Sequence, residues 1–166
     1  EITSRKERGQ YVTLRRLPQR ALIPGFVNTH SHAFQRAIRG RTEYPRQGKA
    51  GQEDFWSWRG LMYHAASRLN PQEIEAISQA VFVEMVKSGI TRVGEFHYLH
   101  HQADGTPYEN PDELAQRVLR GARCAGISVT LLRSFYQRAG VGRPQPEGAQ
   151  KIFCDPGIDF YLETLE

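Results

Sequence analysis

Residues 22–32 read LIPGFVNTHSH, a short apolar run that leads directly into two histidines separated by one residue. An apolar run of this length beside a Pro-Gly pair is typical of a strand that is buried on both faces of a parallel sheet. We therefore predict a buried strand over Phe26–Thr29, with His30 and His32 at its carboxyl end. Because residues i and i+2 of a strand point to the same side, the two imidazoles should project together.

A clear helix farther along the chain begins with its own capping residues. Asn70 suits the N-cap, Pro71 suits the first helical position, and Glu73 stands three residues after the cap. Gly89 suits the left-handed residue that ends such a helix. The apolar face of this helix is predicted from Ile74, Ile77, Val81 and Met85. Before it we predict a short helical turn, a polar loop and another helix, over Ala33–Arg39, Gly40–Asp54 and Phe55–Leu69.

The same pattern repeats after a second strand, which we predict over Ile90–Phe96. An Asn-Pro pair beginning at Asn110, followed by Glu113, predicts the start of another helix, and Gly126 is placed to end it. A third apolar strand is predicted over Ile127–Tyr136. The buried stripe of the intervening helix is predicted from Leu114, Val118 and Leu119.

Strands that are apolar on both faces and alternate with helices indicate an α/β fold with a parallel sheet. An open doubly wound sheet and a (β/α)8 barrel are the two alternatives. The junction after the first strand contains neither GxGxxG nor a P-loop, which disfavours a nucleotide-binding sheet. Because a complete barrel needs about 250 residues, we predict that residues 21–166 form a partial TIM-type barrel, its first three strand and helix units.

The positive charge of the chain is concentrated at its beginning. The 166 residues carry a formal net charge of +4. Residues 1–20 hold six basic and two acidic residues, which accounts for all of it, and residues 21–166 hold sixteen of each. No basic stripe interleaved with aromatic residues runs through the body of the chain, so nucleic-acid binding is not expected. We interpret residues 1–20 as a polar, irregular, basic lead-in.

Composition also indicates the compartment. No apolar run approaches the length of about 18 residues that a membrane-spanning helix needs, and the first ten residues lack the apolar segment of a signal peptide. Cys124 and Cys154 form no CxxC pair and are predicted to be reduced thiols. We therefore expect a cytoplasmic protein without membrane partners.

The pair His30 and His32 is the strongest chemical signal. Two imidazoles on one side of a strand end suit two nitrogen ligands of one metal ion, at the end of a barrel where active sites lie. Catalytic zinc takes three protein ligands and keeps a position for water. His97 is one alternative for the third ligand, but it could equally orient a neighbour, and His100 and His101 have the appearance of loop residues.

Several sequence blocks resemble a known family. The pattern PGxx(N/D)xHxH at residues 24–32 is similar to the first barrel strand of the amidohydrolase superfamily. HSHAFQR at 30–36, FWSWR at 55–59 and EFHYLHH at 95–101 resemble, in this order, the formimidoylglutamate deiminases of that superfamily. The stretch at 131–142 fits the same family. The resemblance covers about residues 21–166.

This resemblance implies a zinc-dependent hydrolysis in histidine degradation, in which N-formimino-L-glutamate and water give N-formyl-L-glutamate and ammonia. It implies that His30 and His32 bind Zn2+, one ion per active site, although another divalent metal is an open alternative. Gln35 and Tyr98 would line the substrate pocket, and Arg59 would bind a substrate carboxylate. Because the substrate carries two carboxylates, more than one cationic group is expected.

The family also implies that further metal ligands and the acid and base groups come from later strands, so no catalytic residue is assignable in this chain. We therefore expect the isolated chain to be inactive, and a homodimer is an expectation for the full-length form. In the family a small β-sandwich precedes the barrel, and residues 1–20, a possible remnant of it, are short and Arg-rich for that role.

Two other interpretations of the function stay open. The first is another deaminase of the superfamily, acting on guanine or a related cyclic amidine, and the second is a non-catalytic fragment whose basic lead-in binds an acidic partner. At the level of single residues, Arg59 could be a surface residue stacked on Trp56, Gln35 could be exposed, and Tyr98 could be a core tyrosine. Glu95 is a candidate acid or base, but on an inward-facing strand it could do no more than hydrogen-bond a neighbour.

Overall fold

The computed structural model describes residues 2–41 and 55–165 of the chain. Two sheets are present in this part: an antiparallel pair, β1 and β2, and a three-stranded sheet in the order β3-β4-β5. The strands are β1 (Ile2–Glu7), β2 (Gln10–Arg15), β3 (Phe26–Ser31), β4 (Ile90–His97) and β5 (Ser128–Arg133). The helices are α1 (Phe55–Ala66), α2 (Pro71–Lys87), α3 (Glu113–Ala125) and α4 (Ile158–Glu163), with 3-10 turns η1 (Ala33–Ile38) and η2 (Gly148–Phe153).

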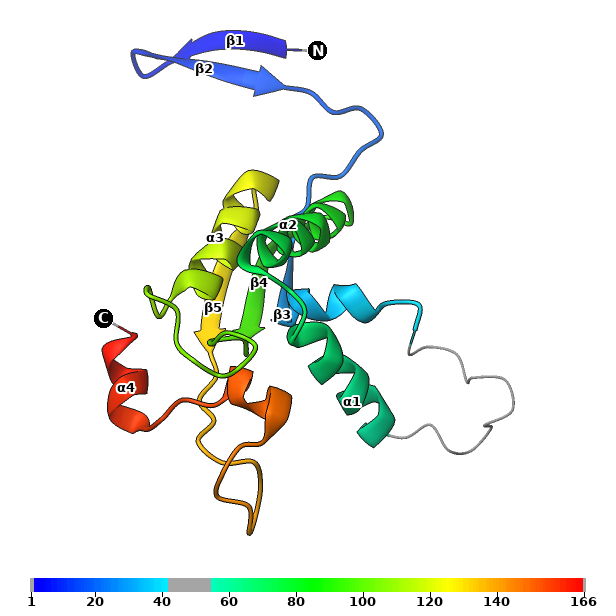
Figure 1. Ribbon diagram of the computed structural model, residues 1–166. Helices are drawn as coiled ribbons and strands as arrows, with labels where there is room; N and C mark the ends of the chain where they lie inside the picture. The colour runs from blue at the N-terminus through cyan, green and yellow to red at the C-terminus, as the bar shows by residue number, and fades with distance from the viewer. Residues whose placement is uncertain (1, 42–54, 166) are drawn as a thin grey trace.

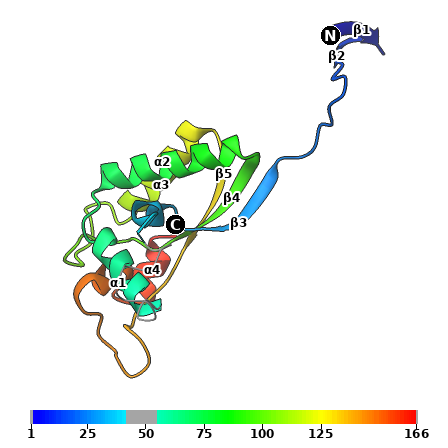
Figure 2. The ribbon, with the colours of Figure 1, turned by 90° about the vertical axis from the view of Figure 1, so that its right-hand side faces the viewer.

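The three-stranded sheet is parallel throughout, as the alternation of strands and helices predicts. β3 pairs with β4, and β4 pairs with β5, both in parallel register. The chain passes from β3 through α2 to β4, and from β4 through α3 to β5. Figures 1 and 2 show α2 and α3 side by side over the sheet, with α1, η2 and α4 gathered at its carboxyl end. The connections therefore place the loops that follow β3, β4 and β5 at one end of the three-stranded sheet.

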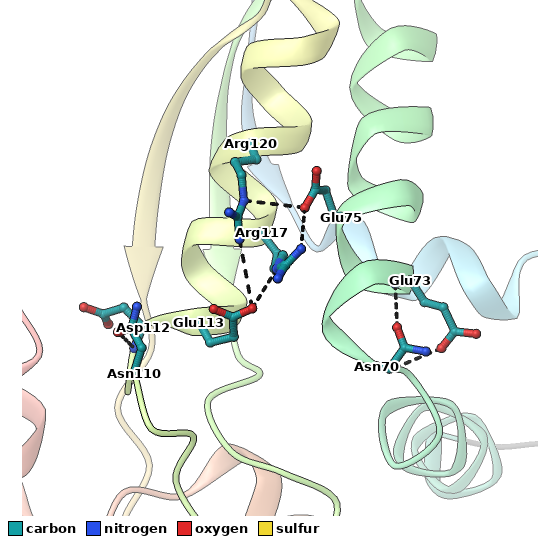
Figure 3. A network of polar contacts seen from close by, with 8 residues as sticks. All are labelled: Asn70, Glu73, Glu75, Asn110, Asp112, Glu113, Arg117 and Arg120. Atoms are coloured by element: carbon teal, nitrogen blue, oxygen red, sulfur yellow. Dashed lines mark hydrogen bonds and ion pairs between the residues drawn. The ribbon is translucent and has the colours of Figure 1, made fainter.

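Helix α2 begins where its capping residues predict. The side chain of Asn70 accepts a hydrogen bond from the backbone N–H of Glu73, and the Glu73 carboxylate accepts one from the backbone N–H of Asn70, each at 2.9 Å (Figure 3). This reciprocal pair is a capping box. Gly89 adopts φ +86°, the left-handed conformation expected after the helix. Local chemistry therefore sets both ends of α2.

The buried face of α2 differs from the one that apolar residues alone predict. Ile74, Ser78 and Phe82 are buried, whereas Ile77, Val81 and Met85 are only partly buried. The buried line is rotated because α3 packs closely against α2 at Ser78, where a small polar residue fits better than a large apolar one. The prediction was right for Ile74 and in part for Val81 and Met85, which pack against the core while partly exposed, but it missed the fully buried Ser78 and Phe82.

Helix α3 begins two residues later than its turn residues predict. The side chain of Asn110 accepts a hydrogen bond from the backbone N–H of Asp112 at 3.0 Å, which closes a turn before the helix instead of capping it. Leu114 and Val118 are buried as expected, and Gly126 ends the helix with φ +76°. Asn110 thus closes a turn at the end of the preceding loop, and the helix begins at Glu113.

Charged side chains join α2 and α3 across their contact. Arg117 Nη1 lies 3.0 Å from Glu75 Oε2 on α2, and Arg117 Nε lies 2.7 Å from Glu113 Oε1 on its own helix. Arg120 Nε lies 3.5 Å from the same Glu75 oxygen (Figure 3). These groups are partly exposed, so each pair contributes little by itself, and the network mainly aligns the two helices.

Replacing Gly121 by alanine should destabilise the protein, because α2 passes directly over this position. A Cβ added there would lie 2.9 Å from the backbone N of Gln79 and 2.9 Å from the backbone O of Glu75. Alanine favours the helix by about 1 kcal/mol over glycine, but overpacking against fixed backbone costs about 1–3 kcal/mol. We expect a net loss of up to about 2 kcal/mol in the free energy of unfolding, measured by urea denaturation.

Gly60→Ala is the matched control for this prediction. Gly60 also lies inside a helix, and a Cβ added there meets nothing within 4 Å. The same exchange should therefore stabilise the protein by about 0.5–1 kcal/mol. Equal stabilisation by both exchanges would show that the contact between α2 and α3 is looser than the structure indicates.

Strand β3 forms as predicted but is not buried. Phe26 and Val27 are each 58% exposed, and Leu22 and Ile23 before the strand are exposed as well. The reason is that β3 lies at the edge of the sheet and pairs with β4 on one side only. The core instead centres on Ile74, Phe82, Val93 and Ile152.

Other predictions concern the ends and connections of the chain and the absence of a membrane-spanning helix. The lead-in, predicted as irregular, forms the β1–β2 hairpin over Ile2–Arg15, so that part of the prediction was wrong; backbone pairing between its two halves explains the difference. Its interpretation as a β-sandwich remnant stays a prediction. The predicted loop Gly40–Asp54 lies outside the described residues from 42 onward. Across the described residues, no helix is long and apolar enough to span a membrane.

Candidate active site

The site begins where β3 ends, with the two histidines that the sequence singles out. His30 Nε2 and His32 Nε2 lie 3.0 Å apart, so their ring nitrogens converge on one point. The two rings stand edge to face with centroids 4.7 Å apart, and Phe96 packs against His30 at 4.4 Å. The period of the strand brings both imidazoles to the same side, as predicted.

The orientation of His32 is set by the neighbouring strand. Its Nδ1 lies 3.0 Å from the backbone O of Phe96, and donation to this carbonyl leaves the lone pair of Nε2 free to bind a ligand. Burial lowers the pKa of His32, the Phe96 hydrogen bond opposes this effect, and the nearby His30 adds to the lowering. His32 is therefore neutral at pH 7, the form that binds metal ions.

The histidine pair fits two positions of a zinc site. Two nitrogens bound to one tetrahedral zinc at about 2.0–2.1 Å lie about 3.3 Å apart, close to the observed separation of 3.0 Å between the Nε2 atoms. Within residues 2–41 and 55–165, no group of three or more His, Cys, Asp and Glu residues could hold a metal ion. The nitrogen donors and their spacing therefore fit two ligands of a metal ion.

His97 does not provide the third ligand. It is 5% exposed, its ring packs against His100 at 5.4 Å, and among the described residues it belongs to no group of three His, Cys, Asp or Glu residues that could hold a metal ion. Burial, together with the nearby charges of His100 and Arg133, holds the pKa of His97 well below its ordinary value. The alternative that placed His97 on the metal is therefore not supported by the geometry.

His100 and His101 lie in the loop after β4, as expected, and both are buried. His100 Nε2 lies 2.8 Å from the backbone O of Ser134, and His101 Nε2 lies 3.4 Å from Asp155 Oδ1. Asp155 in turn forms a bidentate ion pair with Arg133 at 2.6 and 2.8 Å. This buried polar cluster joins the loop after β4 to the end of β5.

Glu95 holds the turn that follows the histidines. Its Oε1 accepts a hydrogen bond of 2.6 Å from the backbone N–H of Ala33, the first residue after His32. The side chain is buried, and burial raises its pKa, against the hydrogen bonds from Ala33 and Ser31. Glu95 therefore has the structural role of the two that the sequence leaves open: its hydrogen bond fixes the backbone beside His32.

A cavity of about 450 Å³ brings the predicted residues together. Its lining includes His32, Gln35, Arg59 and Tyr98, and His30 adjoins it through His32. These residues come from β3, η1, α1 and the loop after β4. The other lining residues are Phe55, Trp58, Met62, Tyr63, Tyr136, Arg138, Ala139, Gln150, Phe153 and Cys154. Four of the five residues predicted for metal or substrate binding thus line one cavity.

Arg59 satisfies both interpretations that the sequence leaves open. Its Nε donates a hydrogen bond of 2.8 Å to the Tyr63 hydroxyl, and its guanidinium lies over the Trp56 and Tyr63 rings at 5.7 and 5.2 Å. It also lines the cavity and is only partly buried. The aromatic stacking thus fixes the guanidinium while its remaining N–H groups stay available for a planar anion.

Gln35 and Tyr98 line the same cavity on either side of His32. Gln35 Nε2 lies 3.5 Å from the Met62 sulfur, its weak hydrogen-bond partner. The Tyr98 ring packs on His32 at 4.5 Å, and burial, with the hydrogen bond to Tyr136, raises the pKa of Tyr98 to about 12. Tyr98 is therefore a neutral hydroxyl group at the cavity wall, neither fully in the core nor ionised.

The sequence analysis did not predict the cavity-lining residues that follow β5. Tyr136 and Arg138 line the cavity, and the Tyr136 ring lies 5.7 Å from Tyr98. A signal was present, because residues just after a parallel strand lie at the same end of the sheet as His30 and His32. Gln150 on η2 gave no such signal, since only the tertiary fold brings η2 back to the cavity.

A sequence profile of the amidohydrolase family matches residues 21–155. The chain belongs to the amidohydrolase family. The matched region begins just before the stretch that leads to His30 and His32 and extends to Asp155. It contains every residue of the candidate site named above and does not include the β1–β2 hairpin.

The chain is also similar to individual proteins of known name or structure. The chain is 46% identical over 147 residues to formimidoylglutamate deiminase from Pseudomonas aeruginosa, which covers 88% of this chain and 31% of that protein. It is also similar to the crystal structure of an amidohydrolase from Brucella melitensis, with a TM-score of 0.78 and 40% identity over 86% of this chain and 31% of that one. The chain therefore spans about a third of the length of these two relatives.

A more distant structure supports the fold alone. An atrazine chlorohydrolase from Arthrobacter aurescens, in a mutant form complexed with zinc and atraton, superposes with a TM-score of 0.63 at 21% identity. The match covers 86% of this chain and 29% of that one. That protein thus shares the arrangement of β3, β4 and β5 with their helices at low sequence identity.

Proposed function

We propose that this chain supplies the first part of the active site of an enzyme that hydrolyses N-formimino-L-glutamate to N-formyl-L-glutamate and ammonia. The observation that carries the proposal is the cavity that joins the His30 and His32 pair to the Arg59 guanidinium. The similarity to the Pseudomonas aeruginosa formimidoylglutamate deiminase supports the choice of substrate.

The proposed architecture is the first part of a (β/α)8 barrel, in which β3, β4 and β5 are the first three strands. The parallel order of these strands and the helices between them support it. In such a barrel, active sites lie at the carboxyl ends of the strands, where His30, His32 and Tyr98 lie here. The exposed side chains of Phe26 and Val27 would then face neighbouring barrel elements.

His30 and His32 would hold a zinc ion through their Nε2 atoms, with further ligands outside the described residues. Zinc bound there would supply a Lewis acid and lower the pKa of water to about 7. The Phe96 carbonyl would keep His32 in the tautomer that leaves Nε2 free. The atrazine chlorohydrolase of similar fold was solved in complex with zinc, which supports the choice of this metal.

The other residues of the cavity would bind and orient the substrate. In the reaction, the oxygen of water replaces the imino nitrogen at the amidine carbon, and that nitrogen leaves as ammonia. Tyr98, neutral because its pKa is about 12, would donate a hydrogen bond, and Gln35 would offer both a donor and an acceptor. Arg59 would pair with one substrate carboxylate, since a guanidinium matches a carboxylate in two parallel hydrogen bonds.

Replacing Arg59 by alanine tests the choice between an acidic substrate and a neutral ring. In the intact, zinc-supplied protein we expect kcat/KM for ammonia release from N-formimino-L-glutamate to fall about 10- to 100-fold, because a charge-assisted hydrogen bond contributes about 1.5–3 kcal/mol. Arg68→Ala is the control, since Arg68 is exposed and does not line the cavity.

Two outcomes would contradict the proposal. If the wild-type protein releases no ammonia from N-formimino-L-glutamate but deaminates guanine, the substrate is a cyclic amidine and only the family assignment stands. If N-formimino-L-glutamate is turned over and Arg59→Ala has no more effect than Arg68→Ala, the carboxylate is bound elsewhere in the site.

A further inference from the structure

Tyr98 and Tyr136 form a pair of phenols in the wall of the cavity. Both side chains line it, and their rings stand edge to face with centroids 5.7 Å apart. Burial and, after it, the hydrogen bond between the two side chains raise the pKa of Tyr98 to about 12. Tyr98 has a role in the proposed function, whereas Tyr136 has none.

The Tyr98 ring is also held by a residue of the histidine pair. It packs on the His32 ring with centroids 4.5 Å apart. This stacking fixes where the ring lies, but the O–H bond of a phenol still turns about its C–O bond. A polar neighbour is therefore what directs the Tyr98 hydroxyl, and among the described residues that neighbour is Tyr136.

Backbone contacts join the two loops that carry these tyrosines. Tyr98 lies between His97 and His100 in the chain, and both of these residues contact Ser134. The N–H of Ser134 donates a hydrogen bond of 3.0 Å to the backbone O of His97, and His100 Nε2 lies 2.8 Å from the backbone O of Ser134. Because Tyr136 is only two residues beyond Ser134, these contacts bring its side chain to Tyr98.

Tyr136 itself is fixed by its backbone and not by burial of its ring. Its backbone O accepts a hydrogen bond of 2.8 Å from the N–H of Asp155, whose carboxylate is held in the buried ion pair with Arg133. The Tyr136 side chain is 44% exposed. The core therefore does not depend on this ring, and its hydroxyl group is open to another role.

We propose that Tyr136 is a positioning residue, which directs the Tyr98 hydroxyl toward the substrate by donating a hydrogen bond to its oxygen. This inference deepens the proposed function and rests on it for the reaction. A hydroxyl group donates one hydrogen bond and accepts up to two, so Tyr98 can accept from Tyr136 while it donates to the substrate. Accepting a hydrogen bond also makes the Tyr98 hydroxyl a better donor, because bonds in a chain polarise one another.

The direction of this hydrogen bond differs between the free and the bound protein. Without substrate the Tyr98 proton turns toward Tyr136, the direction in which the bond helps to raise the pKa of Tyr98. When the substrate offers an acceptor, rotation of the two O–H bonds reverses the pair. Neither ring has to move for this change.

Exchanging each tyrosine for phenylalanine removes one hydroxyl group and keeps the ring. In the intact, zinc-supplied protein, we expect Tyr136→Phe to lower kcat/KM for ammonia release from N-formimino-L-glutamate by about 3- to 10-fold, the effect of one hydrogen bond. In a Tyr98→Phe protein the same exchange should cost less than about twofold, because the hydroxyl through which it acts is gone. Equal losses in the two backgrounds would overturn the inference, since Tyr136 would then act directly or through the fold.

Tyr108→Phe is the matched control. Tyr108 is partly buried against the core and does not line the cavity, so removal of its hydroxyl should leave kcat/KM unchanged in both backgrounds. A loss in Tyr108→Phe as large as that in Tyr136→Phe would also overturn the inference, because the effect would then belong to any tyrosine hydroxyl of the fold.

Carbon NMR of the substrate-free protein, labelled at the Cζ atoms of tyrosine, separates this inference from the proposed reaction. The Tyr98 resonance is identified by its absence from Tyr98→Phe. It should move in Tyr136→Phe, because Cζ carries the hydroxyl oxygen and the neighbouring ring is retained, and it should stay in place in Tyr108→Phe. A moved resonance supports the pair even if the wild type releases no ammonia, a result that contradicts the proposed function alone. An unmoved resonance overturns the inference even if N-formimino-L-glutamate is the substrate.

Discussion

Replacing His32 by alanine in the intact, zinc-supplied protein should lower ammonia release from N-formimino-L-glutamate by about 1,000-fold, equivalent to about 4 kcal/mol of transition-state stabilisation. His32 Nε2 lies 3.0 Å from His30 Nε2, and its Nδ1 is held by the Phe96 carbonyl, so no neighbouring group of the described residues can take its position. Zinc content, measured by atomic emission, should fall together with activity.

His64→Ala is the control for this variant, because His64 is exposed on α1 and does not line the cavity. It should keep both zinc content and turnover. Unchanged zinc content in His32→Ala would show that the ion is held entirely by other residues. Unchanged turnover with zinc still bound would remove the histidine pair from the reaction altogether.

Exchanging Asp155 for asparagine should lower the free energy of unfolding by about 3–5 kcal/mol, because it leaves a buried charge without its partner. The side chains of Arg133 and Asp155 are 4% and 0% exposed and are joined at 2.6 Å between Nη1 and Oδ2. The exchange removes one charge while keeping the shape. Urea denaturation of the intact protein measures the loss as a lower midpoint.

Asp159→Asn is the matched control, because Asp159 is exposed at the start of α4. It should change the free energy of unfolding by less than about 1 kcal/mol. The double variant Arg133→Met, Asp155→Leu should recover part of the loss, since an apolar pair leaves no buried charge. Loss in the double variant as large as in Asp155→Asn would point to packing rather than charge.

The same carboxylate should make stability depend on pH at the acid end. Burial alone would raise the pKa of Asp155, but the hydrogen bonds from Arg133 and His101 outweigh it and lower the pKa from 3.8 to about 2. A depressed pKa stabilises the fold above the unfolded value and loses this contribution as pH falls through the folded value. The difference between wild type and Asp155→Asn should therefore shrink between about pH 4 and pH 2.

Much of the secondary structure is predictable because its causes are local. The capping box of Asn70 and Glu73 and the left-handed Gly89 each depend on residues within a few positions, and α2 begins and ends accordingly. The parallel order of the sheet follows from the alternation of strands and helices. Where a side chain had a competing local use, as Asn110 does in its turn, the predicted boundary was wrong.

Some residues of the candidate site are likewise predictable from local sequence, and others are brought to the site only by the fold. His30 and His32 are predictable as a pair because the period of a strand puts them on one side. Arg59, Gln35 and Tyr98 came from a resemblance to a family, and their meeting in one cavity is a result of the fold. Arg138 escaped prediction because its position depends on backbone anchors from Asp155 and Arg143.

By itself, the sequence determined the order of strands and helices, the parallel sheet and the position of a histidine pair at a strand end, because these depend on patterns over a few residues. The tertiary structure alone decided which side of α2 is buried, that β3 is exposed at a sheet edge, and that Asp155 pairs with Arg133. Burial and charge pairing depend on residues distant in the chain, whose approach is set by packing of the whole sheet and its helices.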